Sequence, residues 1–355
     1  MIALSRLLAV LLLTLVTGTP LLAAEEEGDR NPLASMPLRH IGPAITSGRI
    51  SDFAFYPGGD HEFLAGISSG NLFRTTNGGI TWDAIFENEG SYAIGVVELD
   101  PNNSNTIWVG TGENNAQRSV AAGDGVYKST DGGKSWTNVG LEDSGHISQI
   151  WINPDDSDEV LVAAQGPLWN GGGDRGLYRT TDGGATWDRI LDIDEHTGVN
   201  EFVVDPRNPD IIVASSYQRR RHVWVLINGG PGSGVHKSTD RGKTWTRVTA
   251  GLPGDHMGRI GLAGAASSPD MIYAIIEAND DEKGVYRSTD FGSNWEKRSS
   301  YMTTSPQYYN EIVVDPKNEN RLYALNTFTM KSEDGGQTFS ALAAESRHVD
   351  DHALW

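Results

Sequence analysis

Residue types that bind polar ligands gather in three segments of this 355-residue chain, at positions 113–124, 167–175 and 218–233. The side chains of interest are Glu113, Asn114, Asn115, Arg118, Asp124, Trp169, Asn170, Asp174, Arg175, Arg219, Arg220, Arg221, His222 and Trp224. Indole rings offer a flat apolar surface, and guanidinium groups hold carboxylates through two parallel hydrogen bonds. This combination favours recognition of a sugar or an acidic ligand, and these residues are the candidate ligand-binding set. The alternative is that the charges are solvated or paired in loops while the tryptophans pack locally.

Hydrolysis of a glycosidic bond requires two carboxyl groups that face each other across the bond. Glu113 and Asp124 are the candidate catalytic residues, and Asp174 and Glu277 are further carboxylates of the same kind. The residues alone do not select a pair. Binding without catalysis and glycoside hydrolysis therefore both stay open.

His348, Asp350 and His352 alternate along the chain, so in a strand their side chains would share one face. They are the only candidate metal ligands, and they are weak ones. Same-face residues of a strand lie about 7 Å apart, which is too far for three of them to reach one ion without a bend. The chain has no cysteine, which excludes zinc–thiolate sites. We expect no metal and no cofactor.

The elements that position these residues are set by an internal repeat. One octapeptide pattern, S/T-x-D/N-x-G-x-S/T-W, occurs six times, with its starts 44 to 58 residues apart. The copies are Thr75–Trp82, Ser129–Trp136, Thr180–Trp187, Ser238–Trp245, Ser288–Trp295 and Ser332–Phe339. The acidic or amide residue fixes a turn, the glycine supplies a positive φ, and the closing ring starts an outer strand. These residues are therefore predicted to be framework.

Each octapeptide follows a short alternating segment, such as Gly176-Leu-Tyr-Arg, and two further strand patterns lie upstream of it. Every unit is thus predicted to be four antiparallel strands, one blade of an all-β β-propeller. The sequence predicts six complete repeats plus the start of a seventh at residues 348–355, and seven blades in the intact protein. Alternatively, this last segment completes an earlier blade. The octapeptides follow the third strand, so we expect ligands on the opposite face, where the loops after the second strand gather.

The N-terminal segment predicts that the protein is exported from the cytoplasm. Residues 1–24 have the charged, apolar and small-residue order of a secretory signal, residues 25–38 form a linker, and residues 39–355 form the propeller, incomplete at its C-terminus. We expect a secreted or periplasmic protein that has no membrane contact after cleavage. Loss of Arg6 with the signal leaves 27 basic against 47 acidic residues, so nucleic acid is not an expected partner.

The octapeptide is similar to the Asp-box, or bacterial neuraminidase repeat, of sialidases, family-74 xyloglucanases and the sortilin ectodomain. The runs Gly110-Thr-Gly-Glu-Asn-Asn and Tyr217-Gln-Arg-Arg-Arg-His-Val-Trp resemble large secreted bacterial proteins described as sortilin-like or glycosyl-hydrolase-like. That resemblance implies a β-propeller, a glycan or a protein or peptide as ligand, and a second propeller downstream in the intact chain.

The same resemblance implies where catalysis should be tested. A family-74 xyloglucanase places an aspartate after the second strand of its first blade, and Ser68 takes that position here. A sialidase needs three arginines and a tyrosine–glutamate pair, and Arg49 and Arg259 are the arginines expected to line the channel. The predicted function is a binding or interaction module, and the alternative is a xyloglucanase-like or sialidase-like glycoside hydrolase.

Overall fold

The computed structural model describes residues 48–115, 120–254, 256–343 and 348–355, and Thr46–Trp355 form one compact unit. Its six sheets are antiparallel, and each follows the order of the chain. The first three are β1–β4 (Ile50–Phe55, Phe63–Ile67, Asn71–Thr75, Asp83–Ala84), β5–β8 (Ile94–Leu99, Ile107–Thr111, Val126–Ser129, Thr137–Asn138) and β9–β12 (Ile147–Asn153, Asp156–Ala164, Gly176–Thr180, Asp188–Leu191).

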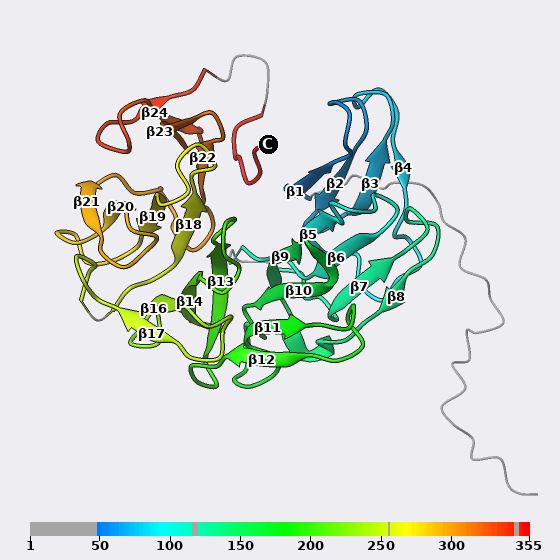
Figure 1. Ribbon diagram of the computed structural model, residues 1–355, viewed down its shortest axis with the longest axis horizontal. Coiled ribbons are helices and arrows are strands. Elements are labelled where there is room, and N and C mark those ends of the chain that lie inside the picture. The colour runs from blue at the N-terminus through cyan, green and yellow to red at the C-terminus, as the bar shows by residue number, and fades with distance from the viewer. Residues whose placement is uncertain (1–47, 116–119, 255, 344–347) are drawn as a thin grey trace, which may run out of the picture. The chain divides into compact units, whose positions relative to one another are not determined.

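The next sheet holds β13 (Thr197–Val204), β14 (Ile212–His222), β16 (Gly234–Ser238) and β17 (Thr246–Val248), with β15 (Val225–Asn228) paired to the end of β14. The last two are β18–β21 (Ile260–Gly264, Ile272–Ile276, Gly284–Ser288, Glu296–Ser299) and β22–β25 (Ile312–Asp315, Asn318–Ala324, Met330–Ser332, Ser340–Ala341). The single helical turn is η1 (Glu142–Ser144), among the described residues. The predicted four-stranded blades are confirmed (Figure 1).

The octapeptides form the predicted turns. In the fourth copy the Asp240 carboxylate accepts hydrogen bonds from the backbone N–H and the hydroxyl of Thr244, at 2.8 and 2.6 Å. The Ser238 hydroxyl oxygen accepts the N–H of Gly242 at 2.9 Å, and this glycine has a φ of 79°. These bonds lower the pKa of Asp240 to about 2, the hydroxyl of Thr244 contributing most.

Three of the closing tryptophans join neighbouring blades. The indole N–H groups of Trp136, Trp187 and Trp245 donate to the carbonyls of Ile85, Val139 and Ile190, each at 2.7 Å and each in the preceding blade. In contrast, the Trp82 indole donates to Gly79 of its own turn. The ring therefore adds a directed bond to the apolar packing between sheets.

The inner strands β1, β5, β9, β13, β18 and β22 face the centre of the molecule (Figure 1). Short polar side chains connect neighbouring ones. The Ser51 hydroxyl donates to the Ile94 carbonyl at 2.7 Å, and the Asn200 amide donates to the Ile260 carbonyl at 2.8 Å. At Gly95 the backbones of β5 and β9 come so close that an added Cβ would lie 2.1 Å from the Ile147 carbonyl oxygen. Neighbouring inner strands are therefore in direct contact.

The segment His348–Trp355 is not a strand. The backbone N–H groups of Asp350 and Asp351 donate to Thr327 and Asn326 beside β23, and the Trp355 ring stacks on Phe55 of β1 at 3.7 Å. The segment thus reaches from the last sheet to the first, where the inner strand of a seventh blade was expected. The seventh blade itself stays a prediction.

The predicted signal and linker, residues 1–24 and 25–38, lie outside the described residues. Within the described part of the chain, no helix is long and apolar enough to cross a bilayer.

Candidate ligand-binding site at the channel mouth

The loops after the second strands of blades two, three and four meet, as the sequence predicts. A guanidinium N–H of Arg219 donates to the carbonyl of Asn114 at 3.5 Å, which joins blades four and two. The backbone N–H of Arg221 donates to the carbonyl of Leu168 in blade three at 2.9 Å. We call this region, at the start of the inner strands, the channel mouth.

Arg219 is a buried cation without a counter-ion. Its residue surface is 1% exposed, and its Nε and one Nη have no hydrogen-bond partner. No carboxylate of the described residues forms an ion pair with it, and its guanidinium lies 5.8 Å from the centre of the Tyr217 ring. Burial lowers the pKa of Arg219 to about 9, with a further contribution from the charges of Arg259 and Arg175. A guanidinium in this state favours any anion that reaches it.

Two other arginines complete the mouth, and both are paired. The guanidinium of Arg259, fully buried, donates to Glu311 at 2.9 Å and to the side chain of Asn115 at 2.7 Å. Arg49 forms an ion pair with the buried Glu113 and lies over the Tyr308 ring at 5.1 Å. The two arginines expected in the channel are therefore there, each bound to a channel carboxylate.

The four candidate carboxylates all have structural partners. Asp124 accepts the Tyr127 hydroxyl at 2.8 Å, and Asp174 accepts the backbone N–H of Asp143 at 3.1 Å. Glu113 is the partner of Arg49. Glu277 accepts the Asn228 amide at 2.7 Å and the backbone N–H of Arg259 at 3.0 Å, while burial raises its pKa.

The remaining predicted residues divide into framework and surface. Arg175 is 1% exposed and donates to four carbonyls of its own loop, including Gln165 at 2.9 Å, so it holds that loop together. Trp169 and Trp224 are 53% and 82% exposed. Asn114 and Asn115 are buried in the mouth, Asn170 is exposed, and Arg220, Arg221 and His222 are half-buried. Arg118 lies outside the described residues.

The three candidate metal ligands do not converge. His348 is exposed, whereas His352 is buried and stacks on the Tyr309 ring at 5.1 Å, and Asp350 accepts the Tyr309 hydroxyl. No group of three suitable ligands occurs in the described parts of the chain.

Tyr217 and Glu277 lie near each other at the channel mouth but are linked through Asn228. The Tyr217 hydroxyl donates to the side chain of Asn228, and the Asn228 amide donates to Glu277. The asparagine therefore separates the two groups. Ser68, at the xyloglucanase aspartate position, is fully buried, and its hydroxyl has no partner.

Sequence reasoning missed a set of acids deeper in the channel. Asp52 and Glu98 line a cavity of about 320 Å³ together with Glu201 and Glu311. Burial raises the pKa of Asp52 to about 7 and that of Glu98 to about 8, where the charge of Asp52 adds to the effect. Burial also raises the pKa of Glu201. An acidic residue within the apolar patterns of β1, β5 and β13 was the available signal.

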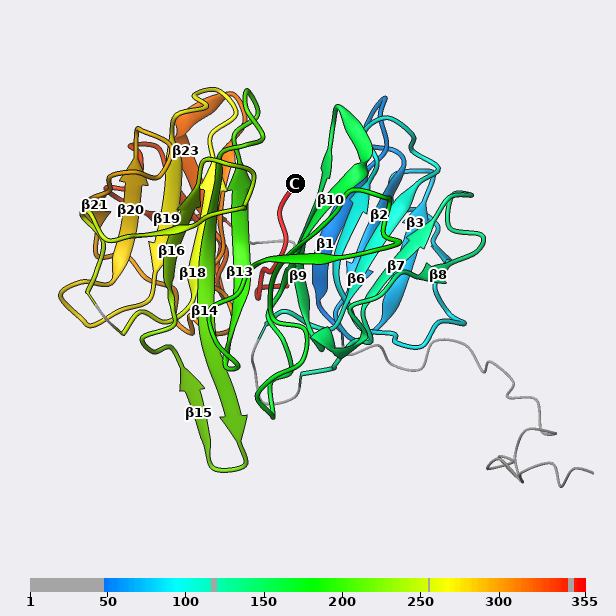
Figure 2. The same ribbon diagram turned by 60° about the horizontal axis from the view of Figure 1, so that its bottom comes forward.

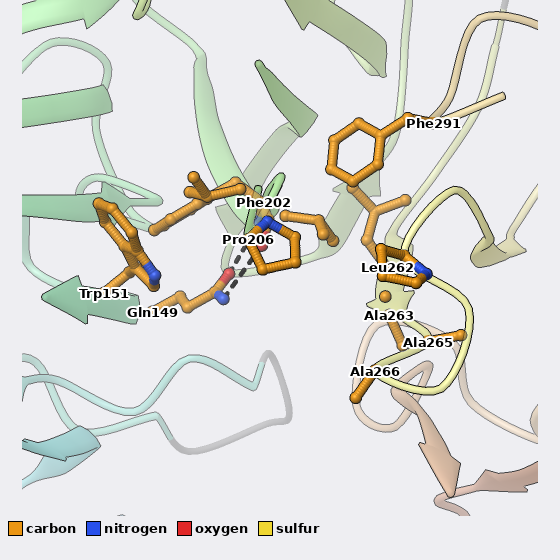
Figure 3. A pocket seen from close by; sticks show the side chains of 13 residues that line it. Gln149, Trp151, Phe202, Pro206, Leu262, Ala263, Ala265, Ala266 and Phe291 are labelled. Carbon is orange, nitrogen blue, oxygen red and sulfur yellow. Dashed lines mark hydrogen bonds between the residues drawn. The ribbon is translucent and has the colours of Figure 1, made fainter. Parts of the chain in front are cut away.

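A second hollow of about 380 Å³ lies near the opposite ends of β9, β13 and β18 and is mainly apolar (Figure 3). Phe202, Leu262, Phe291 and Trp151 line it, and the side chain of Gln149 is hydrogen-bonded to the backbone of Phe202. None of the predicted site residues borders this hollow.

Comparisons with known proteins agree with the fold. The family model described as Sortilin-Vps10, sortilin and neurotensin receptor 3, matches residues 124–282. A probable oligoxyloglucan-reducing end-specific xyloglucanase from Neosartorya fischeri is 26% identical over 285 residues, which is 74% of this chain and 31% of that protein. The chain spans less than a third of the length of the curated relatives it matches.

Among solved structures, the GH74 xyloglucanase from Xanthomonas campestris has a TM-score of 0.53 at 14% identity, over 85% of this chain and 54% of that one. A structure of YCF48 bound to D1 peptide has a TM-score of 0.52 at 18% identity, over 84% and 83% of the two chains. The sheets, the repeat and these matches lead to one conclusion: the chain is an all-β β-propeller that is similar to the Sortilin-Vps10 family model and to xyloglucanases.

Proposed function

We propose that this propeller is a binding module whose ligand occupies the channel mouth through an acidic group. The observation that carries the proposal is Arg219, a buried guanidinium with two N–H-bearing nitrogens free. Burying an unpaired charge costs several kcal/mol, whereas a hydrophobic side chain of similar size would avoid that cost. Retaining arginine there is reasonable if an anionic ligand supplies the missing partner.

The surroundings of Arg219 support a ligand carboxylate rather than an internal one. Arg259 already has Glu311, and Arg49 already has Glu113, so the acids of the mouth are taken. A ligand carboxylate that enters the mouth would accept hydrogen bonds from the unpaired N–H groups of Arg219. Salt weakens such a contact strongly where it is exposed to solvent and less where it is buried.

The relatives are consistent with a glycan or a peptide as ligand. The xyloglucanases are named for a glycan substrate, and YCF48 is bound to a peptide. A role outside the cytoplasm, as the sequence predicts, is part of this proposal.

Glycoside hydrolysis is the second candidate function, favoured by the xyloglucanase relatives and by the raised pKa of Glu277, which suits a general acid. Against it, each of the four candidate carboxylates is bound by neighbouring side-chain or backbone groups.

A paired screen tests both functions. Xyloglucan oligosaccharides, oligogalacturonate and a triglutamate peptide are scored for binding by calorimetry and for release of reducing ends. The binding-module proposal is supported if a carboxylate ligand binds without release of reducing ends and if Arg219→Met abolishes this binding. The control Arg189→Met, at an exposed ion pair, should keep it. Reducing-end release that disappears in Glu277→Gln would replace it with the hydrolase.

A further inference from the structure

Blade four carries an arm that no other blade has in the described chain. β14 pairs with β16 as far as Ser216 and Gly234, then runs on to His222 and pairs with β15 instead. Figure 2 shows this β-hairpin projecting beyond the sheets. We call residues Arg219–Asn228 the arm.

The arm has two different faces, because directly paired residues of antiparallel strands lie on the same side. Arg219 pairs with Asn228 and Arg221 with Leu226, and this face turns to the channel mouth, where Arg219 reaches Asn114 and Asn228 reaches Glu277.

The other face holds the pairs Arg220 with Ile227 and His222 with Val225. It is open to solvent: Val225 and Ile227 are 44% and 41% exposed, and Trp224 at the tip is 82% exposed. The Trp224 ring stacks on the His222 ring at 5.5 Å with an angle of 12° between planes. The stacking sets the exposed Trp224 ring against His222, on the face of the arm that also carries Arg220.

The charge of the arm is opposite to that of the chain. The protein has a net charge of −19 and 47 acidic residues, yet none lies between Asp210 and Asp240. Arg220 and Arg221 form no ion pair with a described residue, and the Nε of each has no hydrogen-bond partner. The acid that contacts the arm is Glu277, on the face turned to the channel mouth, and it is hydrogen-bonded to Asn228. The face that carries Arg220 is the one we assign to an anion, because charges act over a Debye length of about 8 Å.

We infer that the arm is a subsite for an anionic polysaccharide, which extends the ligand from the channel mouth and rests on the function proposed above. A pyranose ring packs its apolar C–H face on Trp224 while a uronate carboxylate meets Arg220. A glycan is favoured over a peptide because the ring is flat and exposed. Peptide anchors instead require a pocket that excludes water.

The test uses oligogalacturonate and its fully methyl-esterified form, which have the same sugar ring with and without the charge. Calorimetry on the whole chain is expected to give at least tenfold tighter binding of the charged form at 50 mM salt, and Trp224→Ala and Arg220→Gln should each weaken it at least fivefold. The matched controls Trp82→Ala and Lys134→Gln, on the exposed octapeptide turns, should leave it unchanged.

Equal affinity for the two forms, or normal binding by Trp224→Ala with an unchanged melting temperature, would overturn the subsite. Triglutamate separates this failure from that of the proposed function. If the peptide binds in a way that depends on Arg219 but not on Trp224, and charged oligogalacturonate is not preferred over its ester, the arm subsite is wrong. The proposed binding at the channel mouth is then still supported.

Discussion

Replacing Arg219 with methionine should stabilise the protein and abolish ligand binding at once. Burial, together with the nearby cations Arg259 and Arg175, lowers the pKa of Arg219 to about 9, so the folded protein disfavours the charged form. An unpaired buried charge costs on the order of several kcal/mol in the ligand-free protein. Methionine keeps the apolar stem and loses only a 3.5 Å hydrogen bond and the contact with the Tyr217 ring. We expect a net gain of about 1–3 kcal/mol.

Differential scanning calorimetry at pH 7 measures this effect as a melting temperature higher by about 2–5 °C, given the entropy of unfolding of the roughly 300 described residues. Arg259→Met is the matched comparison, because its removal leaves Glu311 buried without its partner and should cost about 3–5 kcal/mol. If Arg219→Met lowers the melting temperature as much as Arg259→Met does, Arg219 has a partner that this account lacks, and the reasoning fails.

Three further predictions concern the channel and the blades. Burial raises the pKa of Glu98 to about 8. Between about pH 4.5 and pH 8 the folded protein therefore keeps a proton on Glu98, whereas the unfolded chain has lost it. The free energy of unfolding falls as the pH rises through this range. The free energy of unfolding of Glu98→Gln should therefore equal that of the wild type at pH 4.5 and exceed it by about 1–3 kcal/mol at pH 8.5. If the melting temperatures of the two proteins change with pH in the same way, this prediction is wrong. In urea unfolding, Trp187→Ala should lower the free energy of unfolding by about 3 kcal/mol and Trp82→Ala by about 1 kcal/mol or less. The reason is that the Trp187 indole donates to the preceding blade, whereas the Trp82 indole donates to its own turn. Equal losses would show that the bond between blades does not stabilise the protein. Gly95→Ala should destabilise strongly, since its Cβ would meet a backbone carbonyl of the next sheet, whereas Gly254→Ala, whose Cβ would make only an ordinary 3.9 Å contact with the Glu282 side chain, should not. Melting temperatures of the two variants measure this, and equal losses would contradict it.

The blades could be predicted because their signals are local. The acid of each octapeptide closes its own turn, as Asp240 does with Thr244, and the strands alternate with period two. The side on which the loops after the second strands gather followed from strand order alone. That a ligand binds there stays a prediction.

The state of each site residue could not be predicted, because partners come from distant blades. Arg175 and Arg219 are both loop arginines in sequence, yet one donates to four carbonyls and the other lies unpaired beside Asn114, 105 residues away in sequence. The inner-strand acids were likewise missed, because Asp52 and Glu98 come together only when β1 and β5 lie side by side.

The central claim is that Arg219 binds the acidic group of a ligand, and one titration tests it most directly. Oligogalacturonate and triglutamate, each compared with its methyl ester, are titrated into the wild type, Arg219→Met and Arg189→Met at low salt. The account predicts that at least one free acid binds, that its ester binds at least tenfold more weakly, and that Arg219→Met alone removes the difference. Binding of both forms with equal affinity, or a preference for the acid that survives in Arg219→Met, would contradict it.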